Sequence, residues 1–243
     1  MKKITALILF LLFVISMSAC TEGSMPNEGN KNNPSKEKSN FDVYLGVDKS
    51  LLKMERTVEM PLYIAKAAIG EKRYMDIYRD DKENEYIYRS GTDFLVGYLD
   101  SCYEYGKRFE EADMVTEKEI EQASKEYLER IAPGVKNYTL DREHSGYGER
   151  EMIFCMQYIY CVNGIQTDDM MAIYFLGDGT FGGYSAYRQG LYNDIELTSK
   201  QKNTIDKDTG AAKFLSLNNG KLYLASETVN DAGAGSQKVT ELK

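Results

Sequence analysis

The amino-acid sequence predicts an α+β fold in which one helix packs on an antiparallel β-meander. Three observations predict this class. A single amphipathic helix is expected over residues 117–132, and four strand-like segments joined by short turns follow it. A similar but less regular pattern precedes the helix, which indicates a second, degenerate unit before it.

The helix has a clear start, a clear face and a clear end. Thr116 and Glu119 have capping-box spacing, in which each side chain accepts a hydrogen bond from the other residue's main chain. Pro133-Gly134 ends the helix. The apolar positions recur at helical spacing and should pack on the sheet: Ile120, Ala123, Tyr127, Leu128 and Ile131.

The strands expected after the helix cover residues 137–143, 151–162, 169–176 and 180–188. Asn163-Gly164 and Asp178-Gly179 are turn pairs that join consecutive strands. The segment 151–162 is mainly apolar at both odd and even positions, unlike a strand with one face in water. We therefore expect its second face to be covered by the N-terminal unit, chiefly residues 62–99, with a partner protein as the alternative.

The rest of the chain is less regular. Before the helix, the sequence predicts a short helix over residues 62–69 and strands at 73–79, 85–89 and 94–99. Residues 91–98 match residues 177–184 at three of eight positions, which is weak evidence of duplication. After Asp194, a hairpin is expected within residues 211–229 around Asn218-Asn219-Gly220, and residues 230–243 are expected to be loose.

The amino terminus has the layout of a secretory signal. Lys2 and Lys3 precede a ten-residue apolar run, which is too short to span a membrane, and small residues follow it. Met17-Ser18-Ala19-Cys20 resembles the lipobox of bacterial lipoproteins, with Met17 where leucine is usual. The resemblance implies diacylglyceryl transfer to Cys20 and cleavage before it. An ordinary secretory signal with a chance cysteine is the alternative.

These features predict five segments along the chain. Residues 21–40 carry Pro, Gly, Asn and Ser without an aromatic residue, and such composition is typical of a flexible tether. The expected segments are a signal peptide (1–19), a tether (20–40), an N-terminal α+β unit (41–111), the helix with four strands (112–190) and a polar C-terminal segment (191–243). The domain is thus expected on the outer side of a cell membrane, anchored by lipid on Cys20.

Charge and cysteine content exclude some classes of function. The chain has 30 basic and 38 acidic residues, and loss of Lys2 and Lys3 with the signal would bring the net charge from −8 to −10. This balance argues against nucleic acid as a partner. Cys155 and Cys161 are too far apart along one strand to form a disulfide. Two alternatives remain. Either Cys102 forms a disulfide with one of these two cysteines, or all three are free thiols that serve as small apolar residues.

Several patterns that can carry chemistry are better explained by turns. Gly177, Gly179 and Gly182 spell GxGxxG but lead into a strand, whereas a dinucleotide site requires a helix there. His144 is the only histidine and lies in a turn-like segment without a GxSxG motif. Asp168-Asp169, and Asp80-Asp81 with Glu83 and Glu85, lack calcium-loop spacing and are interpreted as polar turns. The sequence therefore predicts no catalytic residue, cofactor site or metal site.

Four short motifs lie at the helix ends and turns of residues 116–188: Thr116-Glu-Lys-Glu119, Ile131-Ala-Pro-Gly134, Val162-Asn-Gly-Ile165 and Gly177-Asp-Gly-Thr180. With these motifs the segment resembles a PepSY-like unit, a small α+β module found in propeptides of secreted peptidases and in other extracytoplasmic bacterial proteins. Gln166 stands where a proline is frequent in that family. The resemblance implies a binding, inhibitory or folding-assistance role without catalytic residues.

Two functions of different classes remain. The first is a membrane-tethered binding or regulatory module that is not an enzyme and engages a peptidase or a cell-envelope protein. The alternative is a cell-envelope hydrolase that uses His144 and nearby acidic residues. The sequence favours the module.

Overall fold

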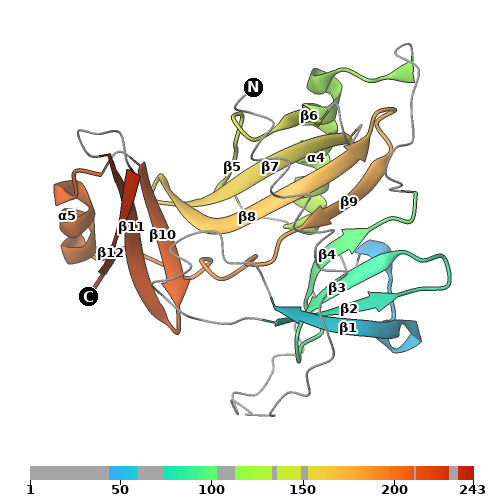
Figure 1. The fold of residues 1–243 in the computed structure, drawn as a ribbon, viewed down its shortest axis with the longest axis horizontal. Helices are drawn as coiled ribbons and strands as arrows, with labels where there is room; N and C mark the ends of the chain where they lie inside the picture. The colour runs from blue at the N-terminus through green and yellow to red at the C-terminus, as the bar shows by residue number, and fades with distance from the viewer. Residues whose placement is uncertain are drawn as a thin grey trace.

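A computed structural model describes residues 44–59, 74–102, 113–132, 136–148, 153–210, 212–229 and 235–243. These residues form a twelve-stranded mixed sheet with two α-helices (Figure 1). The predicted fold class, a helix on a small antiparallel meander, is therefore wrong. The meander exists, but strands from both ends of the chain extend it on either side. The expected signal peptide, tether, Cys20 and helix over 62–69 lie outside the described residues.

The centre of the sheet is a long hairpin of β7 (Ile153–Val162) and β8 (Ile165–Leu176). Asn163 and Gly164 join the two strands with φ angles of 51° and 80°. Positive φ at both turn positions is typical of the type I′ turn, whose twist matches that of the flanking strands. The predicted turn at this pair is confirmed.

From the C-terminal half of β8 the sheet continues towards the N-terminal part of the chain. The order is β9 (Phe181–Ser185), β4 (Leu95–Leu99), β3 (Glu85–Arg89), β2 (Tyr74–Arg79) and β1 (Lys53–Glu59), all antiparallel. The described N-terminal strands thus join β9 edge to edge. Of the N-terminal unit expected to cover the second face of the meander, Leu99 at the end of β4 and Cys102 pack on that face, and residues 60–73 lie outside the described residues. The two similar segments, 91–98 and 177–184, end in β4 and β9, where Tyr98 is paired with Tyr184.

From the N-terminal half of β8 the sheet continues in the other direction. β10 (Ala212–Asn218) pairs with β8 in parallel, and β11 (Lys221–Val229) and β12 (Gly235–Glu241) follow antiparallel. The predicted hairpin around residues 218–220 is confirmed, whereas the expectation of a loose end is wrong because β12 pairs with β11 along seven residues. On the outer edge of β7 lie β5 (Tyr138–Leu140) and β6 (Gly146–Gly148).

The two helices cover different parts of the sheet (Figure 1). α4 (Glu117–Ile131) begins with the predicted capping box of Thr116 and Glu119 and packs against β7 and β8. α5 (Ser199–Lys207), which the sequence analysis missed, has its own capping box of Thr198 and Gln201 and packs beside β10–β12. Each helix contributes buried side chains to a separate apolar core.

The second face of the central hairpin is buried as well. Ile153, Cys155, Ala172, Tyr174 and Leu176 form a cluster there, and Leu99 and Cys102 pack against it. Burial raises the pKa of Cys155 to about 12, so its thiol stays protonated. Cys102, Cys155 and Cys161 all carry thiols and form no disulfide. Within the described residues, no helix is both long and apolar enough to span a membrane.

Candidate functional site

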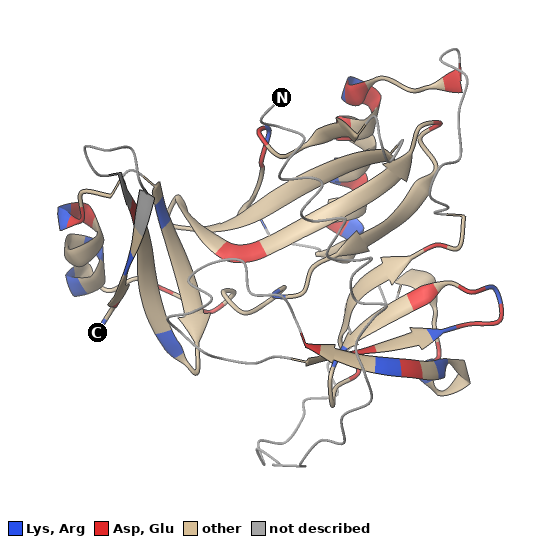
Figure 2. Cartoon of the chain, in the orientation of Figure 1, with Lys and Arg blue, Asp and Glu red and all other residues tan. Residues whose placement is uncertain are grey.

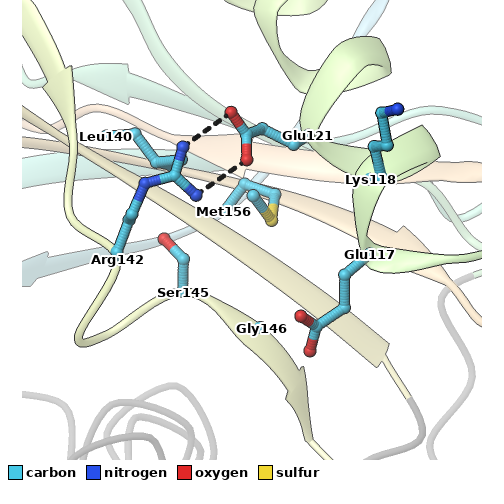
Figure 3. A pocket seen from close by; sticks show the side chains of 8 residues that line it. All are labelled: Glu117, Lys118, Glu121, Leu140, Arg142, Ser145, Gly146 and Met156. Carbon is cyan, nitrogen blue, oxygen red and sulfur yellow. Dashed lines mark hydrogen bonds and ion pairs between the residues drawn. The ribbon is translucent and has the colours of Figure 1, made fainter.

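An open groove of about 350 Å³ lies between the first half of α4 and the loop that joins β5 to β6 (Figure 3). Its walls come from two segments that are distant from each other in the sequence. The lining residues are Glu117, Lys118, Glu121, Leu140, Arg142, Ser145, Gly146 and Met156.

The loop of residues 141–145 projects because β5 and β6 pair with different parts of β7. Between these two ladders, Gln157 is paired with Ala172 of β8 but has no strand residue opposite it on the β5–β6 edge of β7. The Gln157 carbonyl accepts a hydrogen bond from Asp141 N at 2.8 Å, and the Gln157 N–H donates to Ser145 Oγ at 2.9 Å. The Ser145 hydroxyl therefore replaces a main-chain partner and holds the loop against β7.

One wall of the groove is fixed by ion pairs. The guanidinium of Arg142 donates to both carboxylate oxygens of Glu121, at 2.9 and 3.0 Å (Figure 3). Lys125 Nζ lies 2.9 Å from the same carboxylate. The hydrogen bonds from Arg142, and then those from Lys125, lower the pKa of Glu121 to about 2. Because these groups are solvated, the pairs orient the loop more than they stabilise the fold.

On the other side of the groove, two charged side chains have no partner among the described residues. Among all residues that the structure describes, none forms a hydrogen bond or ion pair with the side chain of Glu117 or Lys118. The Glu117 carboxylate lies at the Gly146 side of the groove, and Met156 lies between it and the Arg142–Glu121 pair (Figure 3). Met156 is buried and Leu140 is half-buried. The groove thus combines a free carboxylate with an apolar floor.

His144 lies on the same loop. Its Nδ1 atom is 2.7 Å from Asp141 Oδ2, and Gln157 Nε2 donates to the same oxygen at 3.3 Å. The structure therefore brings together the His and Asp of a possible catalytic dyad, as the hydrolase alternative requires. Ser145 follows His144 directly, but its hydroxyl is bonded to the main chain of Gln157.

The other candidates divide into turns and buried groups. Gly177 and Gly179 belong to the tight connection between β8 and β9, so the predicted hairpin is confirmed. Asp80 closes the β2–β3 hairpin by accepting hydrogen bonds from Lys82 N and Asn84 N. The described residues contain no group of three or more His, Cys, Asp or Glu side chains arranged to hold a metal.

Asp168 and Asp169 are not in a polar turn, as predicted, but are buried within β8. Asp168 accepts hydrogen bonds from Tyr192 and, at 2.7 Å, from Ser216, and Arg188 Nε lies 2.9 Å from it. These three partners follow it by 20 or more residues, so no local pattern reveals the cluster.

Asp169 is fully buried where β8 changes neighbours from β10 to β9. Its Oδ1 accepts a hydrogen bond from the Tyr138 hydroxyl at 2.9 Å, whereas its Oδ2 has no partner. Burial raises the pKa of Asp169 to about 7, although the Tyr138 hydrogen bond opposes the shift. A buried carboxyl that titrates near neutral pH marks this junction.

Comparisons with known proteins gave no match to a family model, a curated protein or a solved structure. The resemblance of residues 116–188 to a PepSY-like unit therefore rests on its sequence motifs alone. In the structure these motifs include the capping box of α4 and the turns at Asn163-Gly164 and Gly177–Thr180. They specify local geometry and do not identify a ligand.

Proposed function

We propose that the chain is a membrane-tethered binding or regulatory module on the extracytoplasmic side of the cell. Lipid on Cys20 holds it there, and the groove beside α4 engages a peptidase or another cell-envelope protein. The order of charge, apolar run, small residues and cysteine at the amino terminus supports the anchoring. The groove supports the binding role.

The observation that carries the binding role is the free Glu117 carboxylate beside the apolar floor of Met156 and Leu140. A lysine or arginine of a partner protein can pair with such a carboxylate while its aliphatic stem covers the floor. The Arg142–Glu121 pair holds the opposite wall in place, which lowers the ordering cost of binding.

Photo-cross-linking in the native host tests the binding role. A photoreactive amino acid at Lys118 should give one adduct of defined mass on the full-length protein. Glu117→Lys should abolish that adduct by charge repulsion, whereas Glu126→Lys, an exposed change on the same helix outside the groove, should leave it intact. An adduct that survives Glu117→Lys, or no adduct with either protein, would contradict the proposal.

Metabolic labelling tests the anchoring. Radioactive palmitate should enter the wild-type protein, and Cys20→Ala should remove the label because the acyl chains attach through this cysteine. Equal labelling of both proteins would show that Cys20 is not the attachment site.

A cell-envelope hydrolase is the second candidate, and the 2.7 Å contact of His144 with Asp141 favours it. In that case Asp141 orients the imidazole, which acts as a general base towards a bound substrate or water. His144→Ala should then abolish the function in the host while the protein remains folded. The binding module predicts instead that His144→Ala leaves function unchanged and that Glu117→Lys removes it.

A further inference from the structure

The joint between β4 and β9 has an approximate two-fold symmetry. β4 and β9 are the last strands of two antiparallel meanders, β1–β4 and β6–β9. Tyr98 and Tyr184, which end the two similar segments 91–98 and 177–184, lie directly opposite each other in this joint. Two meanders of the same kind are thus joined through equivalent final strands, as two identical subunits are in an isologous contact.

The hydrogen bonds and the irregularities around the joint follow the same symmetry. Asp100 N donates to Gly182 O at 2.9 Å. Ala186 N donates to Val96 O at 2.7 Å. The offset between the two similar segments, 86 residues, relates the two donors to each other and the two acceptors to each other. In addition, the β3–β4 and β8–β9 ladders both have three regular pairs and then a register shift. The chain therefore already contains one two-fold contact between final strands.

The third meander, β10–β12, ends in a strand without such a neighbour. β12 pairs with β11 and is the last strand at its end of the described sheet. Leu242 N donates to Leu222 O of β11 at 2.8 Å, and the main-chain groups of an antiparallel strand alternate in direction. Because the β11–β12 register has no shift, the main-chain N–H and C=O groups of Gln237, Val239 and Glu241 point away from β11. Within the described part of the chain, these groups have no hydrogen-bond partner.

The opposite end of the sheet is protected against edge pairing, whereas β12 is not. β1 has a register shift in its ladder with β2, and four of its seven residues are charged (Figure 2). Bulges and charged side chains are devices by which natural sheets block edge-to-edge pairing. β12 has an unbroken register and no proline. Its two charged side chains pair within the chain, Lys238 with Asp208 at 3.2 Å and Glu241 with Lys221 at 3.4 Å. The β12 edge is therefore suited to receive another strand.

The direction of the free main-chain groups selects one pairing of β12 with a second copy of itself. In a two-fold antiparallel pair, the residue on the axis lies opposite its own copy and exchanges both main-chain hydrogen bonds with it. Glu241 on the axis would place two carboxylates side by side. Val239 on the axis pairs all of residues 235–243, whereas an axis nearer the start of the strand pairs fewer described residues. The axis at Val239 also sets Gln237 opposite Glu241 of the second copy.

We propose that the outer edge of β12 is a self-association surface, at which two copies of the chain pair their β12 strands antiparallel about a two-fold axis at Val239. The contact repeats between two chains the joint that β4 and β9 form within one chain. It gives the main-chain groups of Gln237, Val239 and Glu241 the partners that they lack in the single chain. The resulting dimer has one continuous sheet and presents two copies of the groove beside α4.

Cysteine cross-linking of the full-length chain in intact cells of the native host tests the pairing. Val239→Cys places two thiols opposite each other on the axis, where hydrogen-bonded partners have Cα atoms about 5.5 Å apart, within disulfide reach. After oxidation with membrane-permeant diamide, this variant should give several-fold more disulfide-linked dimer than the wild type, whose own thiols set the background. Thr240→Cys, the matched control, points to the other face of β12 and should not exceed that background. No increase with Val239→Cys, or equal yields from both variants, would overturn the proposal.

Charge variants at residue 237 test the register of the pair. Because Gln237 lies opposite Glu241 of the second copy, Gln237→Lys adds two attractive pairs to the dimer, and Gln237→Glu adds two repulsive ones. Combined with Val239→Cys, the lysine variant should therefore give several-fold more cross-linked dimer than the glutamate variant. Both changes lie at an exposed position of the single chain, so the fold of each copy should be unaffected. Equal yields, or the reverse order, would overturn the pairing about Val239.

Discussion

Asp169 offers a quantitative test of how the junction of the sheet is built. The substitution Asp169→Asn keeps the size of the side chain and an oxygen for the Tyr138 hydroxyl, but removes the titratable proton. In the folded protein the carboxyl is fully buried and its pKa is raised from 3.8 to about 7. Asp169→Asn therefore isolates the cost of a charge at this point.

The sign of the effect follows from proton binding. Between about pH 4 and pH 7 the folded state keeps a proton on Asp169 that the unfolded state has lost, so the free energy of unfolding falls as pH rises. A pKa raised from 3.8 to about 7 corresponds to about 4 kcal/mol of unfolding free energy, and the folded protein has lost all of this stability above pH 7. The amide introduced by Asp169→Asn leaves an N–H group without a partner, which costs about 1–3 kcal/mol. At pH 8 we expect Asp169→Asn to stabilise the protein by about 1–3 kcal/mol, the difference between these two effects.

Urea unfolding followed by circular dichroism provides the measurement. The wild-type and Asp169→Asn proteins, both without residues 1–20, are compared at pH 4.5, 6, 7 and 8. The difference in unfolding free energy should move in favour of the variant as pH rises and should level off above pH 7. A difference that is the same at every pH would refute the argument.

The neighbouring carboxylate supplies a control with the opposite sign. Asp168 is paired with the buried guanidinium of Arg188 and accepts hydrogen bonds from Tyr192 and Ser216. Asp168→Asn leaves that guanidinium uncompensated, which typically costs about 3–5 kcal/mol. Adjacent Asp→Asn changes should therefore shift stability in opposite directions at pH 8.

Three further substitutions test separate parts of the fold by thermal or urea unfolding. Ile131→Ala removes a fully buried side chain from α4 and should cost about 2–5 kcal/mol, whereas the exposed Glu126→Ala should change stability by less than about 0.5 kcal/mol; equal effects would mean that the helix face is misassigned. Gly183→Ala places a Cβ against the main chain of β4, so it should destabilise the protein by more than the roughly 1 kcal/mol of a typical substitution. A smaller loss of stability would mean that the β4–β9 pairing is incorrect. Ser145→Ala leaves the Gln157 N–H unpaired and should cost about 1–3 kcal/mol, and an unchanged stability would show that this hydrogen bond is dispensable.

Features that depend on near neighbours in the chain were predictable from the sequence. The start of α4 at its capping box, the Asn163-Gly164 turn and the hairpin around residues 218–220 all match the structure. The same chemistry at Thr198 and Gln201 was overlooked because the surrounding segment is polar, although it marks the start of α5. Local signals therefore existed for both helices.

Features that depend on distant pairing were not predictable in this way. The apolar character of both faces of β7 correctly indicated that both are covered, and the structure buries both. The pattern did not show that β4 joins the edge of β9, or that β10 joins β8 in parallel. Register and neighbour choice between such strands depend on long-range packing, to which a single sequence gives little access.

The chemistry of the candidate groove also depends on long-range packing, so it is hard to infer from residue types alone. His144, Asp141 and Ser145 are close in sequence and include the three residue types of a hydrolase, yet the structure uses Ser145 to complete the ladder of β7. Arg142, an ordinary loop residue in the sequence, meets Glu121 only because that loop bulges towards α4. Since the bulge arises where β5 ends and β6 begins, the groove is a product of interrupted strand pairing. Its function must therefore be tested through an unpaired group of the groove, the Glu117 carboxylate, and not only through His144, the single histidine of the sequence.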